Sequence, residues 1–271
     1  MPISSRGFTG RSTAWLLGCL AGACLLLSVA GVFLVALNWQ NLIPTDPATE
    51  VPTQVPTNVP TLVPTLVPTD VPLPTETGIP INVGSVLLSD DFSSSNWGQG
   101  TDSDSSVEYG GEALQFVVFT KDYFVWSTPD DQDYQNVHME VTAINNDTDS
   151  TTAFGLICNQ QASSDDSFYY FAVTPAGQYA IVRSTVGQDD VFLTNNNEWA
   201  TSSLISRNAS SYRVGADCGN DSLALYVDGQ LIASVSDSSY TTGGVAVFTW
   251  SGLEATSTDM SFDDFLMTSL E

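Results

Sequence analysis

The protein has 271 residues and a formal charge of −25, from 6 Lys and Arg against 31 Asp and Glu. This acidic balance excludes a nucleic-acid-binding surface, because affinity for a phosphate backbone comes from clustered Lys and Arg. The single histidine, His138, excludes a zinc site made of several histidines. The hydrophobic content of 42% is sufficient for a folded core.

The first predicted element is a transmembrane helix over residues 14–37, a stretch of 24 residues without a charge. As a helix this stretch is roughly 36 Å long, which crosses a hydrocarbon core of about 30 Å with some tilt. Arg6 and Arg11 precede it, so the positive-inside rule places residues 1–13 in the cytoplasm and everything after the helix outside. A cleaved signal peptide is the alternative, but the apolar run continues for several residues beyond the candidate cleavage site.

Residues 38–80 are predicted to be a linker that acts as a stalk. Ten of the 13 prolines lie between Pro44 and Pro80, and Val-Pro-Thr recurs every four residues from Val51 to Val67. Proline removes amide donors and biases the preceding residue to extended geometry, so neither a helix nor a sheet ladder forms. At about 3.1 Å per residue in polyproline-II geometry, the proline-rich residues 44–80 reach roughly 115 Å.

The remaining residues, 81–271, are predicted to form one extracytoplasmic domain with 4 cations and 27 acidic residues. Short runs of alternating, β-branched and aromatic residues recur through it, and no apolar helical period competes with them. Asp228-Gly229 predicts a tight hairpin. The pattern indicates an all-β, antiparallel two-sheet sandwich. The predicted strands are Ala113–Thr120, Val137–Ile144, Ala153–Cys158, Phe168–Val173, Tyr179–Val182, Tyr212–Cys218, Leu223–Val227, Leu231–Val235, Val245–Trp250 and Phe262–Met267.

Several pieces of this domain, in their order, also resemble a known superfamily. The chain is similar over roughly residues 85–270 to the concanavalin A-like lectin/glucanase superfamily, in particular to laminin G-like and 3-keto-disaccharide hydrolase-type domains of bacterial surface proteins. The resemblance implies a jelly roll with adjacent first and last strands, but no single function, because this fold supports many. The pieces are Asp90-Asp91-Phe92 with Trp97, Phe168-Tyr169-Tyr170-Phe171, Gly177-Gln178-Tyr179-Ala180-Ile181, Leu225-Tyr226-Val227-Asp228-Gly229-Gln230 and Phe262-Asp263-Asp264-Phe265.

Two cysteines lie outside the predicted membrane segment, Cys158 and Cys218. Both end strand-like runs in a domain expected to lie in an oxidising compartment, so a disulfide between them is predicted. Closing a loop of about 60 residues would contribute roughly 4 kcal/mol in the chain-entropy model. Two separate buried thiols are the alternative, because a sequence does not show the Cα spacing that a bridge requires.

No catalytic residue is predicted. Strand alternation places His138 and Glu140 on the same polar face, where we expect a solvated histidine. Retaining glucanases of the superfamily carry two carboxylates on one strand in a Glu-x-Asp-x-Glu motif, which this domain lacks. Its nearest glutamate pair, Glu108 and Glu112, is separated by a predicted turn. The sequence therefore favours binding over catalysis.

No cofactor is predicted, and a structural calcium ion is the alternative. Asp102 and Asp104, and likewise Asp147 and Asp149, present carboxylates at alternate positions, as oxygen-rich loops do. Neither loop has the glycine and the glutamate that an EF-hand requires. Solubilising surface charge explains these residues equally well, so no metal ligand is assigned.

Aromatic residues are the candidates for sugar binding, because sugars stack their apolar faces on Trp and Tyr while charged groups fix the hydroxyls. Trp126, Tyr170, Trp199 and Trp250 lie at predicted strands or strand ends, and Arg183 is a nearby cation. These five residues are the predicted carbohydrate-binding set, with a polysaccharide or glycoconjugate as the partner.

Together these features predict a single-pass protein of the cell membrane that displays a non-catalytic, lectin-like module outside the cell. With only four basic residues in the domain, strong charge-assisted binding of an acidic ligand is not expected, and affinity for a short oligosaccharide should lie around the millimolar range. Two alternatives remain open. One is a glycoside hydrolase of the 3-keto-disaccharide hydrolase type, and the other is a structural or adhesive surface domain without a small ligand.

Overall fold

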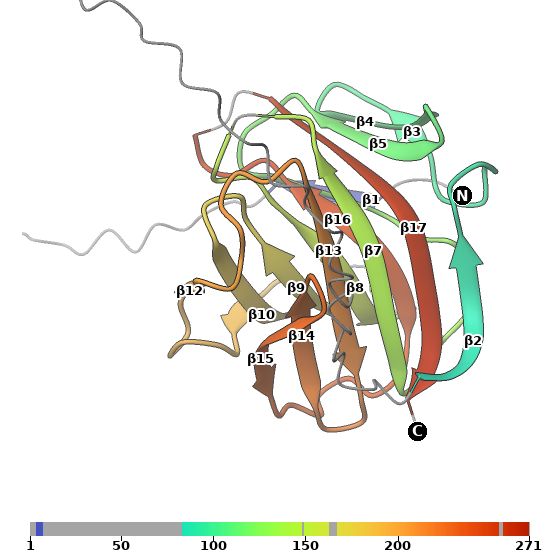
Figure 1. Cartoon of the computed structure of the whole chain (residues 1–271), viewed down its shortest axis with the longest axis vertical. Coiled ribbons are helices and arrows are strands. Elements are labelled where there is room, and N and C mark those ends of the chain that lie inside the picture. Colours follow the sequence, from blue (N-terminus) through green and yellow to red (C-terminus); the bar gives the residue numbers. More distant parts are fainter. Residues whose placement is uncertain (1–3, 8–82, 148, 163–166, 255–256, 271) are drawn as a thin grey trace, which may run out of the picture. The chain divides into compact units, whose positions relative to one another are not determined.

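Two antiparallel β-sheets make up the part of the protein that the computed structural model describes, residues 4–7, 83–147, 149–162, 167–254 and 257–270. The predicted membrane helix and the stalk lie outside these residues. Within the described residues, no helix has the length and apolarity needed to cross a membrane. The all-β sandwich predicted for the outer domain is confirmed (Figure 1).

The first sheet, sheet A, has eight strands, and its five central strands are β6, β16, β8, β9 and β10. Three of these strands are formed by continuously apolar or aromatic segments, as is typical of strands that are buried on both sides. In spatial order sheet A contains β1 (Ser4–Gly7), β6 (Tyr123–Ser127), β16 (Gly244–Trp250), β8 (Ala153–Gln160), β9 (Phe168–Val173), β10 (Gln178–Ser184) and β11 (Val191–Phe192), and β12 (Ala200–Thr201) also pairs with β10.

The second sheet, sheet B, has nine strands, and its long C-terminal strand β17 pairs with β7, β5 and β2. Because β2 is the first strand of the outer domain and β17 the last, the adjacency implied by the superfamily resemblance is confirmed. In spatial order sheet B contains β15 (Gln230–Val235), β14 (Leu223–Val227), β13 (Ser211–Cys218), β7 (Val137–Asn145), β17 (Thr258–Leu270), β5 (Ala113–Val118), β4 (Ser105–Gly110) and β3 (Gly100–Thr101), and β2 (Val83–Asp90) pairs with β17.

Every strand predicted from alternation is present, with ends that differ by a few residues. Strands β2, β4 and β6 and the two-residue strands were not predicted, because they are short or lack clear alternation. The Asp228-Gly229 hairpin is confirmed, since both residues have positive φ, 50° and 73°, between β14 and β15. Glu112 has a φ of 64° and lies in the turn between β4 and β5, as expected.

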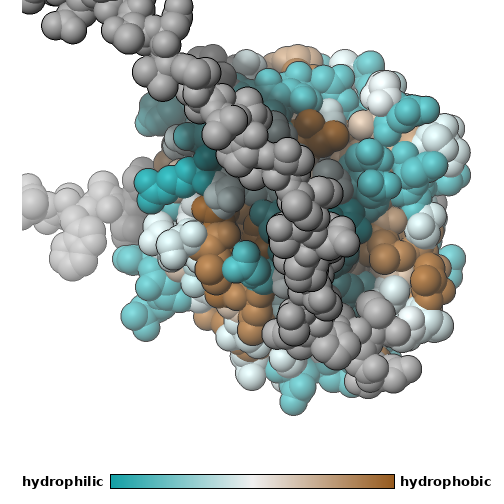
Figure 2. Space-filling view, in the orientation of Figure 1, coloured by the Kyte–Doolittle hydropathy of each residue, from teal (hydrophilic) through white to brown (hydrophobic). Residues whose placement is uncertain are grey.

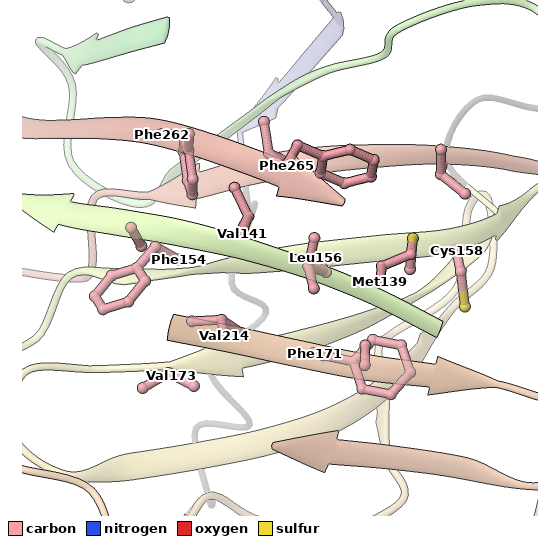
Figure 3. Packing of buried hydrophobic residues seen from close by; sticks show 14 of the residues in the cluster. Met139, Val141, Phe154, Leu156, Cys158, Phe171, Val173, Val214, Phe262 and Phe265 are labelled. Atoms are coloured by element: carbon pink, nitrogen blue, oxygen red, sulfur yellow. The ribbon is translucent and has the colours of Figure 1, made fainter. Parts of the chain in front are cut away.

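The main core lies between the two sheets. Alternate residues of β7 and β13 from sheet B pack against alternate residues of β8 and β9 from sheet A, and Figure 3 shows Val141 and Val214 opposite Leu156 and Phe171. The predicted disulfide is confirmed: Cys158 of β8 and Cys218 of β13 are bonded, with their Cα atoms 6.6 Å apart. The bridge therefore links sheet A to sheet B through the core.

Strand β1 is formed by residues from the segment that we expect to be cytoplasmic. It pairs with β6, and Ser4 lies opposite Trp126. In one molecule this pairing and a cytoplasmic N-terminus exclude each other, because residues on opposite sides of a membrane cannot share a sheet. Protease treatment of intact cells distinguishes the two positions of the N-terminus relative to the membrane.

Candidate functional site

Sheet A is apolar on both of its faces. In each central strand, one set of alternate residues joins the main core, and the other set forms a second cluster whose strand residues come from sheet A alone. We call the face that carries this second cluster the outer face of sheet A. An antiparallel sheet normally exposes a polar outer face, so this apolar one is the unusual feature of the domain. The buried members of the cluster are Phe124, Trp126, Ala153, Ile157, Phe168, Tyr170, Ala172, Ala180, Val182, Ala246 and Phe248.

Aromatic rings dominate the buried part of this outer face. Phe124 stacks on Phe248 with ring centroids 4.6 Å apart, and on Phe168 at 6.0 Å. Trp126 meets Phe168 edge-on at 5.6 Å, and Tyr170 meets Phe124 edge-on at 5.4 Å. Such ring pairs stabilise a fold beyond the area they bury. Trp126 and Tyr170 are therefore packing residues, with only 1% and 5% of their surface exposed.

The accessible aromatic surface lies at the margin of the outer face, where Trp199 and Trp250 are only half-buried. Their rings are nearly parallel, at 15°, with centroids 6.4 Å apart, and Phe192 meets Trp199 at 5.7 Å. We call Trp199 and Trp250 the tryptophan platform. Partly exposed indole faces are the kind of apolar surface on which a sugar ring stacks.

Trp199 is held by an unusual left-handed turn. Asn195, Asn196 and Asn197 have φ values of 46°, 55° and 70°, a region that asparagine tolerates better than most residues. The Asn195 side chain donates to the Trp199 carbonyl at 2.7 Å, and the Phe192 amide donates to the Asn197 side chain at 2.8 Å. Asn195 and Asn197 thus hold the backbone next to Trp199.

A carboxylate lies at the edge of the platform. The Trp250 indole donates to Oδ1 of Asp122 at 3.3 Å, and the Asp122 amide donates to the Gly252 carbonyl at 2.6 Å. Burial raises the pKa of the Asp122 carboxyl above its ordinary value, against the lowering effect of the Trp250 hydrogen bond. Sequence reasoning missed Asp122 and the asparagine turn. The Asn-Asn-Asn run before Trp199 was the available signal, as a turn sequence.

Arg183 does not belong to this face. Its guanidinium donates to Asp237 at 2.6 Å and to Ser239 at 2.7 Å, and the same Asp237 accepts the Tyr169 hydroxyl. These contacts tie the segment that follows β15 to sheet A. Of the five predicted sugar-binding residues, the structure thus brings Trp126, Tyr170, Trp199 and Trp250 to one face and directs Arg183 away from it.

His138 is not the solvated histidine that alternation predicted. It lies on the outer face of sheet B, and only 2% of its surface is exposed. Its Nδ1 is 2.6 Å from Asp217 and its Nε2 is 3.4 Å from Glu140. His138 and Glu140 share one face of the strand, as expected. Burial alone would lower its pKa, but the bonds to Asp217 and then Glu140 outweigh burial and raise the pKa to about 9. Because both ring nitrogens are paired with carboxylates, we assign His138 a structural role as part of an ion-pair network.

The acidic loops close turns. Oδ1 of Asp102 accepts the amides of Asp104 and Ser105, each at 2.8 Å, and Oδ1 of Asp149 accepts the Thr151 amide at 2.6 Å. In the described part of the chain, no group of three or more His, Cys, Asp or Glu is placed to hold a metal ion. A surface depression of about 430 Å³ beside β2 and β17 is floored by Arg213, whose guanidinium is already bonded to Glu140, Thr142 and the Asp264 carbonyl.

The exposed large apolar side chains of the described residues come from several separate segments of the chain. They are scattered over loops and strands of both sheets, and Figure 2 shows apolar areas interrupted by hydrophilic ones on the visible face. Scattered exposed apolar residues are normal for a soluble surface, so they mark no site. They are Val86, Leu87, Phe119, Val186, Val191, Leu204, Leu231 and Leu253.

Comparisons with known proteins define the class of fold. No protein-family model matches the chain, and no curated protein matches it. Among solved structures it is similar to a protein of unknown function with a galectin-like fold from Bacillus subtilis, at 10% identity and a TM-score of 0.51, over 69% of this chain and 97% of that one. It is also similar to the Crh5 transglycosylase, at 13% identity and a TM-score of 0.51, over 72% and 90%.

A third similar structure is a glycosidic hydrolase, at 10% identity and a TM-score of 0.50, over 68% of this chain and 95% of that one. The described domain therefore has the two-sheet, jelly-roll fold of these structures, which is the fold that the resemblance in the sequence implied. These likenesses establish the fold, and the function is argued from the residues on its surface.

Proposed function

We propose that the domain is a non-catalytic carbohydrate-binding module that contacts sugar through the tryptophan platform. The observation that carries this proposal is the pair of nearly parallel, half-buried indoles of Trp199 and Trp250, with the Asp122 carboxylate at their edge. Stacking and a few hydrogen bonds made against water give weak binding, so the Kd for a short oligosaccharide should be about millimolar.

The distribution of carboxylates supports binding over hydrolysis. The five central strands of sheet A contain no aspartate and no glutamate. A retaining glycosidase needs two carboxyl groups about 5–5.5 Å apart on either side of the bond to be cleaved. On this sheet such a pair would have to come from the connecting segments, which supply Asp122 and Asp190 to the aromatic cluster, the latter through the Tyr170 hydroxyl at 3.0 Å.

We further propose that this module is displayed outside the cell by the apolar segment 14–37 and the proline-rich linker 38–80. The support is the uncharged run, which arginines flank closely on its N-terminal side while the next cation after it is Lys121. Many copies on one membrane would recover avidity for a polymer that each head binds weakly. A protease added to intact cells should then remove the domain and leave an N-terminal tag protected. Removal of the tag as well would instead agree with the pairing of β1 and β6.

Glycan-array binding of the full-length protein tests the binding function. Trp199→Ala should weaken binding at least about tenfold, because removing one of two stacking rings removes most of a weak contact. Leu231→Ala, an exposed apolar position on β15 of sheet B, is the matched control and should bind as wild type does. Binding unchanged in Trp199→Ala contradicts the platform, and release of cleaved sugar by the wild-type protein contradicts a non-catalytic module.

A further inference from the structure

The Asp122 carboxylate is fixed at the edge of the tryptophan platform by its neighbours. Its own amide donates to the Gly252 carbonyl, and the Ser251 hydroxyl accepts the Tyr123 amide at 3.1 Å while donating to the Thr120 carbonyl at 2.7 Å. These bonds join the connection between β5 and β6 to the segment that follows β16. The same segment begins directly after Trp250, so the carboxylate and the indole keep one mutual position.

This carboxylate has spare capacity for a cation. Among the described residues, its side chain has one hydrogen-bond donor, the Trp250 indole on Oδ1, and Oδ2 accepts none. The ion pairs of the described chain belong to His138, Arg183 and Arg213, and none includes Asp122. Lys121 precedes Asp122 but has an exposed side chain and no ion pair with a described carboxylate.

We propose that the platform selects sugars that carry a free ammonium group, as glucosamine units do, over their neutral counterparts. This inference rests on the proposed sugar-binding function. An ammonium beside an indole face gains a cation–π contact, and an ammonium beside a carboxylate gains a charge-assisted hydrogen bond. Trp250 and Asp122 are hydrogen-bonded to each other, so one ammonium group can make both contacts there. The domain has 27 acidic residues and 4 cations, and this negative charge attracts a cationic polymer.

The test compares three tetrasaccharides on the full-length protein by calorimetry: a glucosamine tetramer, its N-acetylated form and a neutral glucose tetramer. The measurements use mildly acidic to neutral buffer, so that the amine is protonated and the carboxyl ionised. We expect the glucosamine tetramer to bind about tenfold tighter than the other two. Asp122→Asn keeps the shape and should reduce this preference to within about threefold, while Glu108→Gln, which removes the same charge on β4 of sheet B, should preserve it.

The possible results distinguish the ammonium preference from the proposed sugar-binding function. If the neutral tetramers bind as tightly as the glucosamine tetramer, and Trp199→Ala still weakens binding at least about tenfold, the ammonium preference is wrong and the sugar-binding platform stands. If Glu108→Gln reduces the preference as much as Asp122→Asn does, the selectivity comes from overall charge and the Asp122 assignment is wrong. If no tetramer binds, both proposals fall.

Discussion

The two outer faces of this sandwich differ in chemistry although both belong to antiparallel sheets. The outer face of sheet A carries stacked aromatic rings such as Phe124, Phe248 and Phe168. The outer face of sheet B carries a polar network, in which Gln115 donates to Asp259 at 2.9 Å and Arg213 and His138 pair with Glu140. In both sheets, alternate residues of each strand point away from the main core. The two outer faces differ because these outward positions hold aromatic residues in sheet A and polar or charged residues in sheet B.

The contrast shows where a ligand gains most. On sheet B, His138 and Arg213 already pair with Glu140 and Asp217, so a ligand at these groups would have to displace existing bonds. On sheet A the margin offers half-buried indoles and one carboxylate oxygen without a donor among the described residues. The proposed sugar-binding site therefore lies on the aromatic side of the sandwich.

The largest effect is expected at the bond that joins the two sheets. Replacing both Cys158 and Cys218 with alanine should lower the free energy of unfolding by about 4 kcal/mol, since the bridge closes a loop of 60 residues. Urea unfolding of the double variant measures the loss. Thiols that react with an alkylating reagent in the folded, air-exposed wild-type protein would contradict the bridge.

A slightly smaller loss is expected from the aromatic face. Phe124→Ala removes a ring that stacks on Phe248 and Phe168 and is 1% exposed, so unfolding should cost about 3 kcal/mol less than in the wild type. Chemical denaturation provides the measurement. A loss below about 1 kcal/mol would mean that this face is open to water in solution and that its rings do not form a second core.

The stability that His138 contributes on the outer face of sheet B should depend on pH. The pKa of His138 is about 9 in the folded protein and 6.5 when unperturbed, so its ion pairs stabilise the fold fully below about pH 6.5 and lose that effect as pH rises through about 9. The loss should be on the order of 2 kcal/mol, because Glu140 and Asp217 are partly solvated. Unfolding of wild type and His138→Gln at about pH 6 and about pH 9.5 checks it. An equal pH dependence in the two proteins would refute the assignment.

The smallest effect is expected on the outer face of sheet B away from His138. Gln115→Ala removes hydrogen bonds to the Asp259 carboxylate in a partly solvated position, and should lower the free energy of unfolding by about 1 kcal/mol or less. It is the matched counterpart of Phe124→Ala on the other face. If both variants lose the same free energy of unfolding in urea titrations, the two outer faces do not differ in their contribution to stability.

Much of the fold could be predicted before the structure. Alternation located the strands that have a clear inner and outer side, such as Val137–Asn145, and Asp228-Gly229 located a hairpin. Strand β6, Tyr123–Ser127, was missed because a five-residue run that is apolar on both faces shows no period. The disulfide was predicted from compartment and strand position, while its Cα spacing of 6.6 Å came only from the fold.

The sequence by itself determined the local order of this protein, because strand period and turn chemistry are encoded by near neighbours. Only the tertiary structure decided which residues share a face. It placed Trp199 against Trp250, turned Arg183 toward Asp237 and enclosed His138 between two carboxylates. These contacts join segments far apart in the chain, and their geometry depends on sheet order and register, which local patterns do not specify.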